Sequence, residues 1–186
     1  MIAASAGGVH ALEVLAGELP ADLSVPVLVI LHVSPHHKSL LPEILARAGA
    51  LSAAEASDGE PLRAGHIHVA APDHHLLVSQ NRLRVTRGPK ENHFRPSADV
   101  LFRSAAYHFG ERVIGVVLSG SLADGSSGLY SIKRMGGIAI IQDPEEALYK
   151  SMPLASLNRA AIDYALPAPE IGQLLGALAR EPAGSA

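Results

Sequence analysis

Ser5, His32 and Asp124, three residue types that together make an activated nucleophile, each follow an apolar run of the sequence. A histidine can take the proton of a serine hydroxyl, and a carboxylate can orient the imidazole and stabilise the cation that forms. In open α/β sheets, residues distant in sequence meet beyond the carboxyl ends of the strands. We therefore expect acyl transfer by a serine nucleophile. The order Ser, His, Asp differs from the Ser, Asp, His order of the α/β-hydrolases.

The stretch around Ser5 predicts a strand, a sharp turn and a helix. Four residues run into Ser5, a double glycine follows at Gly7 and Gly8, and an apolar helical period continues over residues 9–18. Small neighbours let the backbone pass close to an exposed serine oxygen. Unpaired N–H groups in the first turn of the helix favour negative charge beside that oxygen. This pattern is typical of a nucleophile elbow.

Each of the three residues also has a purely structural interpretation. Ser5 could cap the first helix, and Asp124 could cap the helix that follows Gly125. His32 could be a hydrogen-bonded histidine at a strand end. The occurrence of all three at strand ends favours the catalytic interpretation.

The elements that must position these residues alternate between strands and helices. Apolar or alternating runs predict strands that end before Ser5 and at 25–31, 53–56, 66–70, 113–118, 138–141 and 164–166, with 66–70 half-buried. Residues 73–78 and 82–86 are predicted to form a hairpin. Helical periods predict helices at 9–18, 39–48, after an N-cap at Ser97, and at 129–135, 154–161 and 169–179. We expect one α/β domain with a mostly parallel sheet over residues 1–180, and a flexible tail at 181–186.

Composition limits the classes of function. The chain has 186 residues, of which 48% are hydrophobic and 18% charged, as in a globular domain. The net charge of -3 gives no support for nucleic-acid binding. The absence of cysteine excludes disulfides, thiolate nucleophiles and cysteine-ligated zinc. There is no signal-peptide pattern and no apolar run near ~18 residues, so we expect a cytoplasmic protein that does not insert into membranes.

Several motifs occur in order along the chain and together resemble one family. They are Ala4-Ser5-Ala6-Gly7-Gly8, the strand into His32, Arg-Pro-Ser-Ala-Asp-Val-Leu-Phe at 95–102, Leu-Ser-Gly-Ser-Leu-Ala-Asp-Gly at 118–125, and Ser151-Met152-Pro153. Over roughly residues 1–178 the chain resembles the catalytic domain of the chemotaxis protein-glutamate methylesterases, the CheB family. The resemblance implies a doubly wound sheet with helices on both faces. It also implies hydrolysis of glutamate γ-methyl esters on chemoreceptors, and some members also deamidate receptor glutamines.

The resemblance assigns roles to particular residues and implies partners. It makes Ser5 the nucleophile, His32 the base and Asp124 its partner, with no cofactor and no metal. The methylated cytoplasmic helices of chemoreceptors are the implied substrate. The family's phosphoacceptor domain has no counterpart in this sequence. We therefore expect either that a separate protein regulates this one or that it is not regulated through phosphorylation of such a domain.

Two places depart from the family's pattern. Ala6 stands where the family often has threonine, and Ser121 and Leu122 stand where many members have methionine and a second glycine. The backbone amide at the methionine place serves the oxyanion in the family, so the N–H groups of Ala6 and Ser121 remain the candidate donors. Leu122 does not easily adopt a positive φ. If the loop needs that conformation, we expect a reshaped loop, and the loss of one oxyanion donor would cost roughly 3 kcal/mol of barrier.

Other residues suggest further sites and functions. The histidines include pairs at His36-His37, His66 and His68, and His74-His75, but no carboxylate lies at a metal-ligand spacing, and we expect no metal site. The basic residues Arg82, Arg84, Arg87, Lys90 and Arg95 predict either a face for an acidic partner or a solvated hairpin edge. Two further functions stay open: an inactive or weakly active interaction module of the same fold, and a serine esterase for another ester. A small-molecule esterase would need a deep apolar pocket, whereas a receptor esterase needs an open, shallow cleft.

Overall fold

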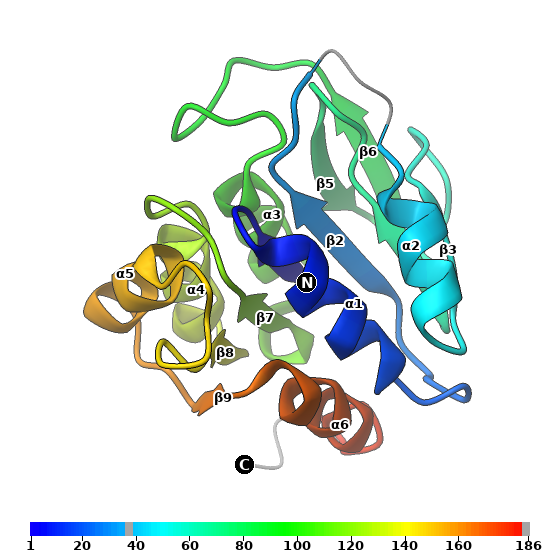
Figure 1. The fold of residues 1–186 in the computed structure, drawn as a ribbon. Coiled ribbons are helices and arrows are strands. Elements are labelled where there is room, and N and C mark those ends of the chain that lie inside the picture. The colour runs from blue at the N-terminus through cyan, green and yellow to red at the C-terminus, as the bar shows by residue number, and fades with distance from the viewer. Residues whose placement is uncertain (36–38, 184–186) are drawn as a thin grey trace.

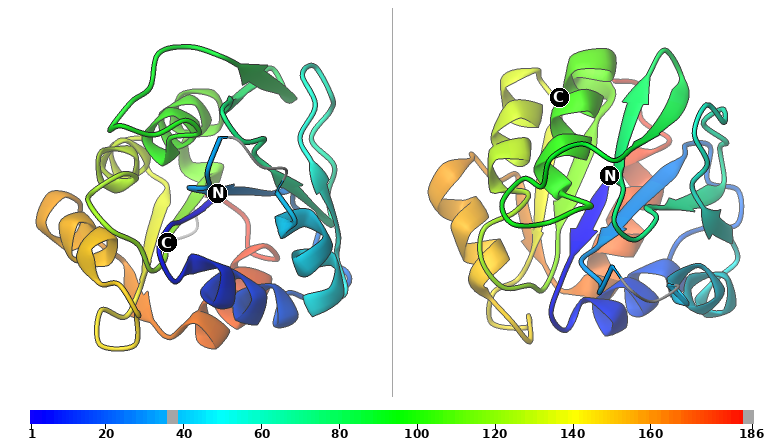
Figure 2. Two further views of the ribbon diagram at one scale, coloured as in Figure 1. Left: turned by 45° about the horizontal axis from the view of Figure 1, so that its top comes forward. Right: turned by 90° about the horizontal axis from the view of Figure 1, so that it is seen from above.

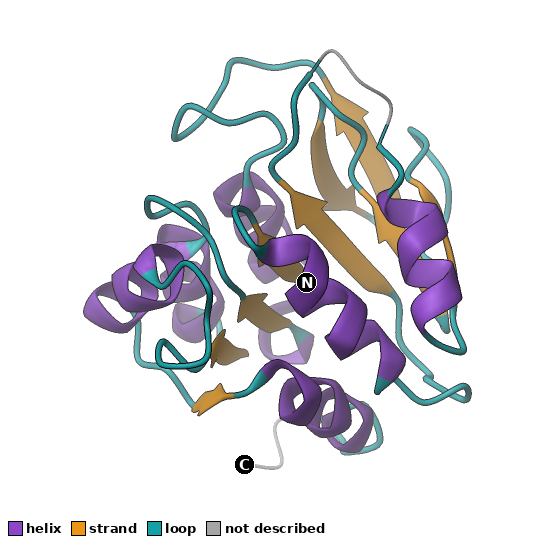
Figure 3. Cartoon of the chain, in the orientation of Figure 1, coloured by secondary structure: helices purple, strands orange, loops and turns teal. Residues whose placement is uncertain are grey.

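The fold is built on a seven-stranded, fully parallel sheet with the strand order β3-β4-β2-β1-β7-β8-β9 (Figures 1 and 3). A computed structural model describes residues 1–35 and 39–183 of the chain. The strands are β1 (Ile2–Ala4), β2 (Val27–Leu31), β3 (Ser52–Glu55), β4 (His66–Val69), β7 (Ile114–Val117), β8 (Ile138–Gln142) and β9 (Tyr164–Leu166). Every residue of β1 and β2 is buried, as expected for strands covered on both faces.

Helices cover both faces of the sheet, which confirms the predicted doubly wound α/β architecture (Figure 2). One face carries α1 (Gly8–Gly17), α2 (Leu41–Ala48) and α6 (Ala168–Leu178). The other carries α3 (Ala98–Phe109), the short η1 (Gly110–Arg112), α4 (Ser126–Arg134), α5 (Ser151–Arg159) and the antiparallel hairpin β5 (His75–Ser79) and β6 (Arg82–Thr86). Each layer buries its own apolar cluster against the sheet.

The chain changes direction across the sheet between β1 and β7. The helix after β1 packs on one face, and the helix after β7 packs on the other. β1 pairs with β2 through Ala4 and Leu31, and with β7 through Ala3 and Val117. The loops that leave these strands therefore diverge at their carboxyl ends. Ligands bind at such a switch point in open α/β sheets, and Ser5 lies there.

β4 differs from the prediction, because all four of its residues are buried rather than half of them. His66 bonds Ser52 Oγ at 2.6 Å and Arg63 at 2.8 Å. His68 Nδ1 lies 3.0 Å from a Glu60 carboxylate oxygen, and its Nε2 accepts the Arg63 N–H at 3.2 Å. The histidines look polar in the sequence, but strand β3 and the segment before β4 cover them and satisfy their ring nitrogens.

Two helices begin three residues earlier than predicted. α4 starts at Ser126 and α5 at Ser151, so the first turns are Ser126-Ser127-Gly128 and Ser151-Met152-Pro153, which the apolar period does not mark. Part of the predicted tail, residues 184–186, lies outside the described residues, as do His36 and His37. Over the described part of the chain, no helix combines the length and apolar character needed to cross a membrane.

Candidate active site

The centre of the candidate site is a contact between His32 and Asp124. His32 Nε2 lies 2.8 Å from Asp124 Oδ2, and the two side chains are 5% and 0% exposed. A carboxylate only accepts hydrogen bonds, so Nε2 carries the proton in this contact. The other nitrogen, Nδ1, is buried and has no hydrogen-bond partner within residues 1–35 and 39–183. The pair therefore presents Nδ1 as the nitrogen available to accept a proton.

Asp124 is surrounded by donors. Besides His32, its oxygens accept from Ser97 Oγ at 2.7 Å, Asn92 Nδ2 at 2.7 Å and the Ala98 N–H at 2.6 Å. Burial would by itself raise the pKa of Asp124, but these hydrogen bonds together hold that pKa below its ordinary value. Asp124 is thus held as an anion that can stabilise an imidazolium.

Asp124 caps a helix, although a different one from the helix suggested by its position in the sequence. α4 has Gly125 as its N-cap, with φ 95°. Asp124 instead accepts the first N–H groups of α3, from Ala98 and Asp99, at 2.6 and 3.3 Å. The positive end of the α3 dipole further favours the carboxylate. One side chain therefore orients His32 and closes the amino end of α3.

Ser5 lies directly after β1, on the predicted turn, and is half-buried. Its N–H donates to Ser119 O at 3.0 Å, and its carbonyl accepts the Gly8 N–H at 2.8 Å. Gly7 forms the N-cap of α1 with φ 71°, and a Cβ there would meet Ser119 Oγ at 2.9 Å and Leu148 Cβ at 3.0 Å. Only glycine fits this left-handed, crowded position, which fixes the sharp turn after Ser5.

The strand register places Ser5 and His32 side by side. They are the residues that follow the paired ends of β1 and β2, and the His32 N–H donates to Ala4 O at 3.2 Å. Among the described residues, no hydrogen bond joins the Ser5 hydroxyl to His32. Catalytic hydrogen bonds are often long or poorly aligned before substrate binds, so the missing bond does not count against Ser5 as the nucleophile.

The predicted oxyanion donors lie in the two loops that flank Ser5. Within the described residues, neither the Ala6 nor the Ser121 N–H donates a hydrogen bond. The following Leu122 adopts the left-handed conformation, with φ 69°, and its side chain projects outward. The loop thus has a positive φ at the place where many family members have glycine. The expectation that leucine would avoid a positive φ is wrong at this residue, because Leu122 itself takes the strained conformation.

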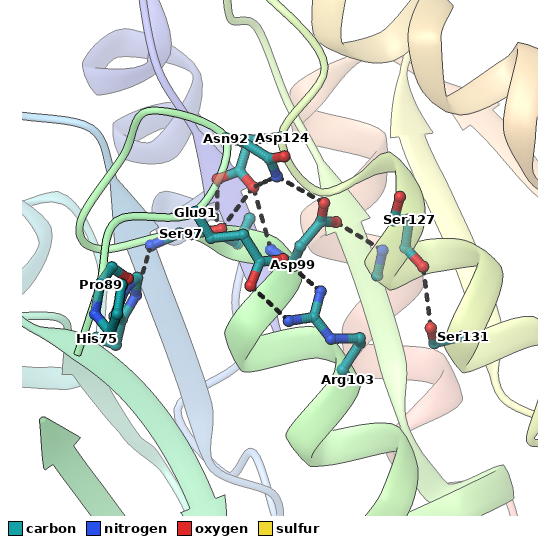
Figure 4. A network of polar contacts seen from close by, with 12 residues as sticks. His75, Pro89, Glu91, Asn92, Ser97, Asp99, Arg103, Asp124, Ser127 and Ser131 are labelled. Carbon is teal, nitrogen blue, oxygen red and sulfur yellow. Dashed lines mark hydrogen bonds and ion pairs between the residues drawn. The ribbon is translucent and has the colours of Figure 1, made fainter.

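Three residues that contact the pair were not singled out from the sequence as site residues. The Phe94 ring stacks on the His32 imidazole, with centroids 3.6 Å apart and planes 3° apart. Asn92 and Ser97 both bond Asp124 (Figure 4). Ser97 occupies the N-cap of α3 as predicted, but its hydroxyl bonds Asp124 instead of capping the helix. Asn92 and Phe94 lie in a polar loop, where no periodic signal marks them.

The other sequence candidates have structural partners. No group of three or more metal-binding side chains occurs in the described parts of the chain. Of the basic residues at 82–95, Arg87 and Arg95 both pair with Asp73, at 2.6 Å each, and Arg84 pairs with Asp58 at 3.2 Å. These ion pairs favour the interpretation of this segment as a solvated hairpin edge over a face for an acidic partner.

The cavity beside His32 is small. It holds about 60 Å³ and is lined by His32, Phe94, Arg95, Lys90 and Asp73, among others. A far larger apolar cavity of about 720 Å³ lies at the amino ends of the strands, around Met1, Leu23, Ile114 and Leu178. It is at the opposite edge of the sheet from Ser5, so it is not the site of the chemistry.

Comparisons with known proteins show the family and the fold of the chain. The family model described as CheB methylesterase matches residues 1–175. The crystal structure of the Thermotoga maritima CheB methylesterase catalytic domain has a TM-score of 0.90 to this chain, at 30% identity, covering 95% of this chain and 96% of that one.

Relatives with curated names give the same result. A protein-glutamate methylesterase/protein-glutamine glutaminase of Anaeromyxobacter dehalogenans is 37% identical over 97% of this chain and 53% of its own length. A Leptospira interrogans protein, provisionally given the same name, is 33% identical over 94% of this chain and 91% of its own. The chain thus spans about half of some relatives and nearly all of another. Because the family model covers almost the whole chain, the protein belongs to the CheB methylesterase family.

Proposed function

We propose that this chain hydrolyses glutamate γ-methyl esters on chemoreceptors, with Ser5 as nucleophile, His32 as base and Asp124 as its orienting partner. The observation that carries the proposal is the buried contact from His32 Nε2 to Asp124 Oδ2, which leaves Nδ1 without a partner among the described residues. The names of the relatives supply the ester class. The receptors' methylated helices are cytoplasmic, so we place the protein there.

The reaction proceeds by acyl transfer. Ser5 Oγ attacks the ester carbonyl while His32 Nδ1 takes its proton, and Asp124 stabilises the imidazolium. The tetrahedral intermediate collapses when His32 returns the proton to the methoxy oxygen, which releases methanol and leaves a glutamyl ester on Ser5. Water, activated by His32, then hydrolyses this ester and restores the serine. The N–H groups of Ala6 and Ser121 stabilise the negative oxygen in both steps.

The names of the relatives favour a protein substrate over a small-molecule ester, because they are called protein-glutamate methylesterases. A glutamyl side chain that projects from a helix needs only a shallow site, because the rest of the receptor stays outside.

Glutamine deamidation is a second candidate function. The relatives are named as glutaminases as well as methylesterases. The same acyl-enzyme forms when Ser5 attacks a γ-carboxamide, with ammonia as the leaving group after His32 protonates it. Ammonia release from a receptor fragment with glutamine at the modification sites measures this activity separately.

The test is methanol release from a methylated receptor fragment by the wild type and by Ser5→Ala. Release by the wild type alone supports the esterase and its nucleophile together. Equal release by both proteins would overturn the role of Ser5. No release by either would favour the interaction module, provided that circular dichroism shows both proteins folded.

A further inference from the structure

The Asn92 side chain lies between two buried carboxylates (Figure 4). Its amide nitrogen donates to Asp124 Oδ1 at 2.7 Å and to Asp99 Oδ2 at 2.7 Å. Asp124 is 1% exposed and Asp99 is 3% exposed. Because carboxylates are acceptors, the nitrogen and not the oxygen of the amide must face them. One –NH₂ group thus separates two buried acids that would otherwise face each other.

The backbone around Asn92 is shaped to deliver this amide. Asn92 and His93 both have positive φ, at 53° and 72°, as in the central residues of a type I′ turn. The flanking residues, Glu91 and Phe94, exchange two backbone hydrogen bonds, at 2.9 and 3.1 Å. Asparagine is one of the few residues that tolerate this conformation and also carry a donor.

The turn is anchored on both sides of the site. Arg103 of α3 donates to both carboxylate oxygens of Glu91, at 2.6 and 2.7 Å. On the other side, Phe94 stacks on His32. A single tight turn therefore touches both members of the His32–Asp124 pair, one through Phe94 and the other through Asn92.

The pKa values of the two acids are shifted in opposite directions. Burial raises the pKa of Asp99, and the charge of Asp124 raises it further, against the hydrogen bonds from Gly128 and Asn92. The pKa of Asp124 is lowered despite its burial, because of the hydrogen bonds that it accepts. Among the described residues, the charged or titratable groups around this pair are His32 at the end of β2, Arg103 on α3 and Glu91 of the turn, which pairs with Arg103. Removing the Asn92 donor would raise the proton affinity of the whole cluster.

We propose that Asn92 is a positioning residue of the esterase, whose amide holds Asp124 ionised and oriented against His32 while it screens Asp124 from Asp99. The proposal rests on the proposed function for its kinetic readout. Asn92 itself does not touch the reacting atoms in this scheme. Its effect reaches the chemistry through Asp124 and then His32.

The test variant is Asn92→Gly, because glycine keeps the left-handed turn and removes only the amide. We expect kcat for methanol release to fall about 10- to 100-fold, a factor that corresponds to the loss of one hydrogen bond to a charged group. KM should change less than about twofold. The acid limb of the kcat/KM profile should move to higher pH. The matched control is Asn81→Gly, at an exposed left-handed position (φ 61°) in the β5–β6 turn, which should behave as wild type.

A second variant separates the electrostatic role from a structural one. In Asn92→Gly/Asp99→Asn, the neighbouring charge is gone, so kcat should recover at least threefold over Asn92→Gly. Wild-type kinetics in Asn92→Gly would overturn the proposal. A slower Asn92→Gly with an unmoved pH profile and no recovery would overturn it too, because the turn would then be only structural.

A substrate-independent readout keeps this test distinct from that of the proposed function. The titration of the Asp124 carboxyl group, followed by NMR, should shift to higher pH in Asn92→Gly and stay unchanged in Asn81→Gly, because Asn92 is one of the donors that lower the pKa of Asp124. If the wild type releases no methanol while this shift is observed, the proposed function fails and the positioning role stands. An unshifted titration contradicts the positioning role whatever the activity.

Discussion

The Nε2 atom of His32 lies 2.8 Å from Oδ2 of Asp124, so the carboxylate occupies one ring nitrogen and leaves Nδ1 on the opposite side of the ring. The same carboxylate also caps the amino end of α3 by accepting its first N–H groups. Orientation of the base and the start of a helix therefore depend on the same charge. This coupling makes Asp124 the most informative position for mutation.

Asp124→Asn should lower kcat by about 10⁴-fold, because a carboxamide can leave the imidazole in the wrong tautomer. The variant should also lose thermal stability, since an amide group would face several donors. Methanol release and a thermal melt measure the two effects. Activity within tenfold of wild type would contradict the role of Asp124. Ser5→Ala, which leaves these hydrogen bonds intact, is the control for stability.

Phe94→Leu should lower kcat by roughly three- to tenfold, which corresponds to the free energy of one aromatic contact. The reason is that the His32 ring loses the stacked Phe94 ring that holds it in one orientation. Phe94→Tyr keeps the ring and should retain activity near that of wild type. Steady-state kinetics of both variants check the prediction. Equal activity of the leucine and tyrosine variants would show that the stacking does not matter.

Leu122→Gly should stabilise the protein, because leucine at φ 69° has a backbone strain of about 1–2 kcal/mol that glycine does not have. Leu122 is 58% exposed, so little burial is lost. We expect the thermal midpoint to rise by roughly 2–4 °C. Leu40→Gly is the control, since Leu40 is 65% exposed with an ordinary φ of -93°, and it should give no gain. A fall in the midpoint of Leu122→Gly would contradict the argument.

The buried histidines of β4 predict loss of stability in acid. Burial lowers the pKa of both His66 and His68, so the unfolded chain takes up protons at these positions before the folded chain does. Their contribution is complete above the unfolded value of about 6.5 and is lost as the pH falls through the lower folded values. His68→Gln should reduce the slope of the free energy of unfolding against pH, measured by urea denaturation between pH 7 and 5. His10→Gln, at an exposed position of α1, should leave the slope unchanged; equal slopes in all three proteins would refute the prediction.

The sequence predicted most of the elements because their signals are local. Continuous apolar runs marked β2 and β7, and helical periods marked α1 and α6. The predictions were weakest where burial depends on residues that are close in space but not in sequence. β4 was expected to be half-buried, yet His66 and His68 are enclosed by side chains that no period within the strand reveals.

For the site, the sequence by itself determined that Ser5 and His32 directly follow strands and that Asp124 lies in the loop after a third strand. The placement of Ser5, His32 and Asp124 follows from where apolar runs stop, and parallel strands bring such ends to one edge. Only the tertiary structure decided which ring nitrogen meets Asp124, and that Asn92 and Phe94 reach the pair. These contacts join residues that lie 32 to 92 positions apart in the chain. Packing of α3 and the 91–94 turn against the sheet sets them, and residue spacing carries no record of that packing.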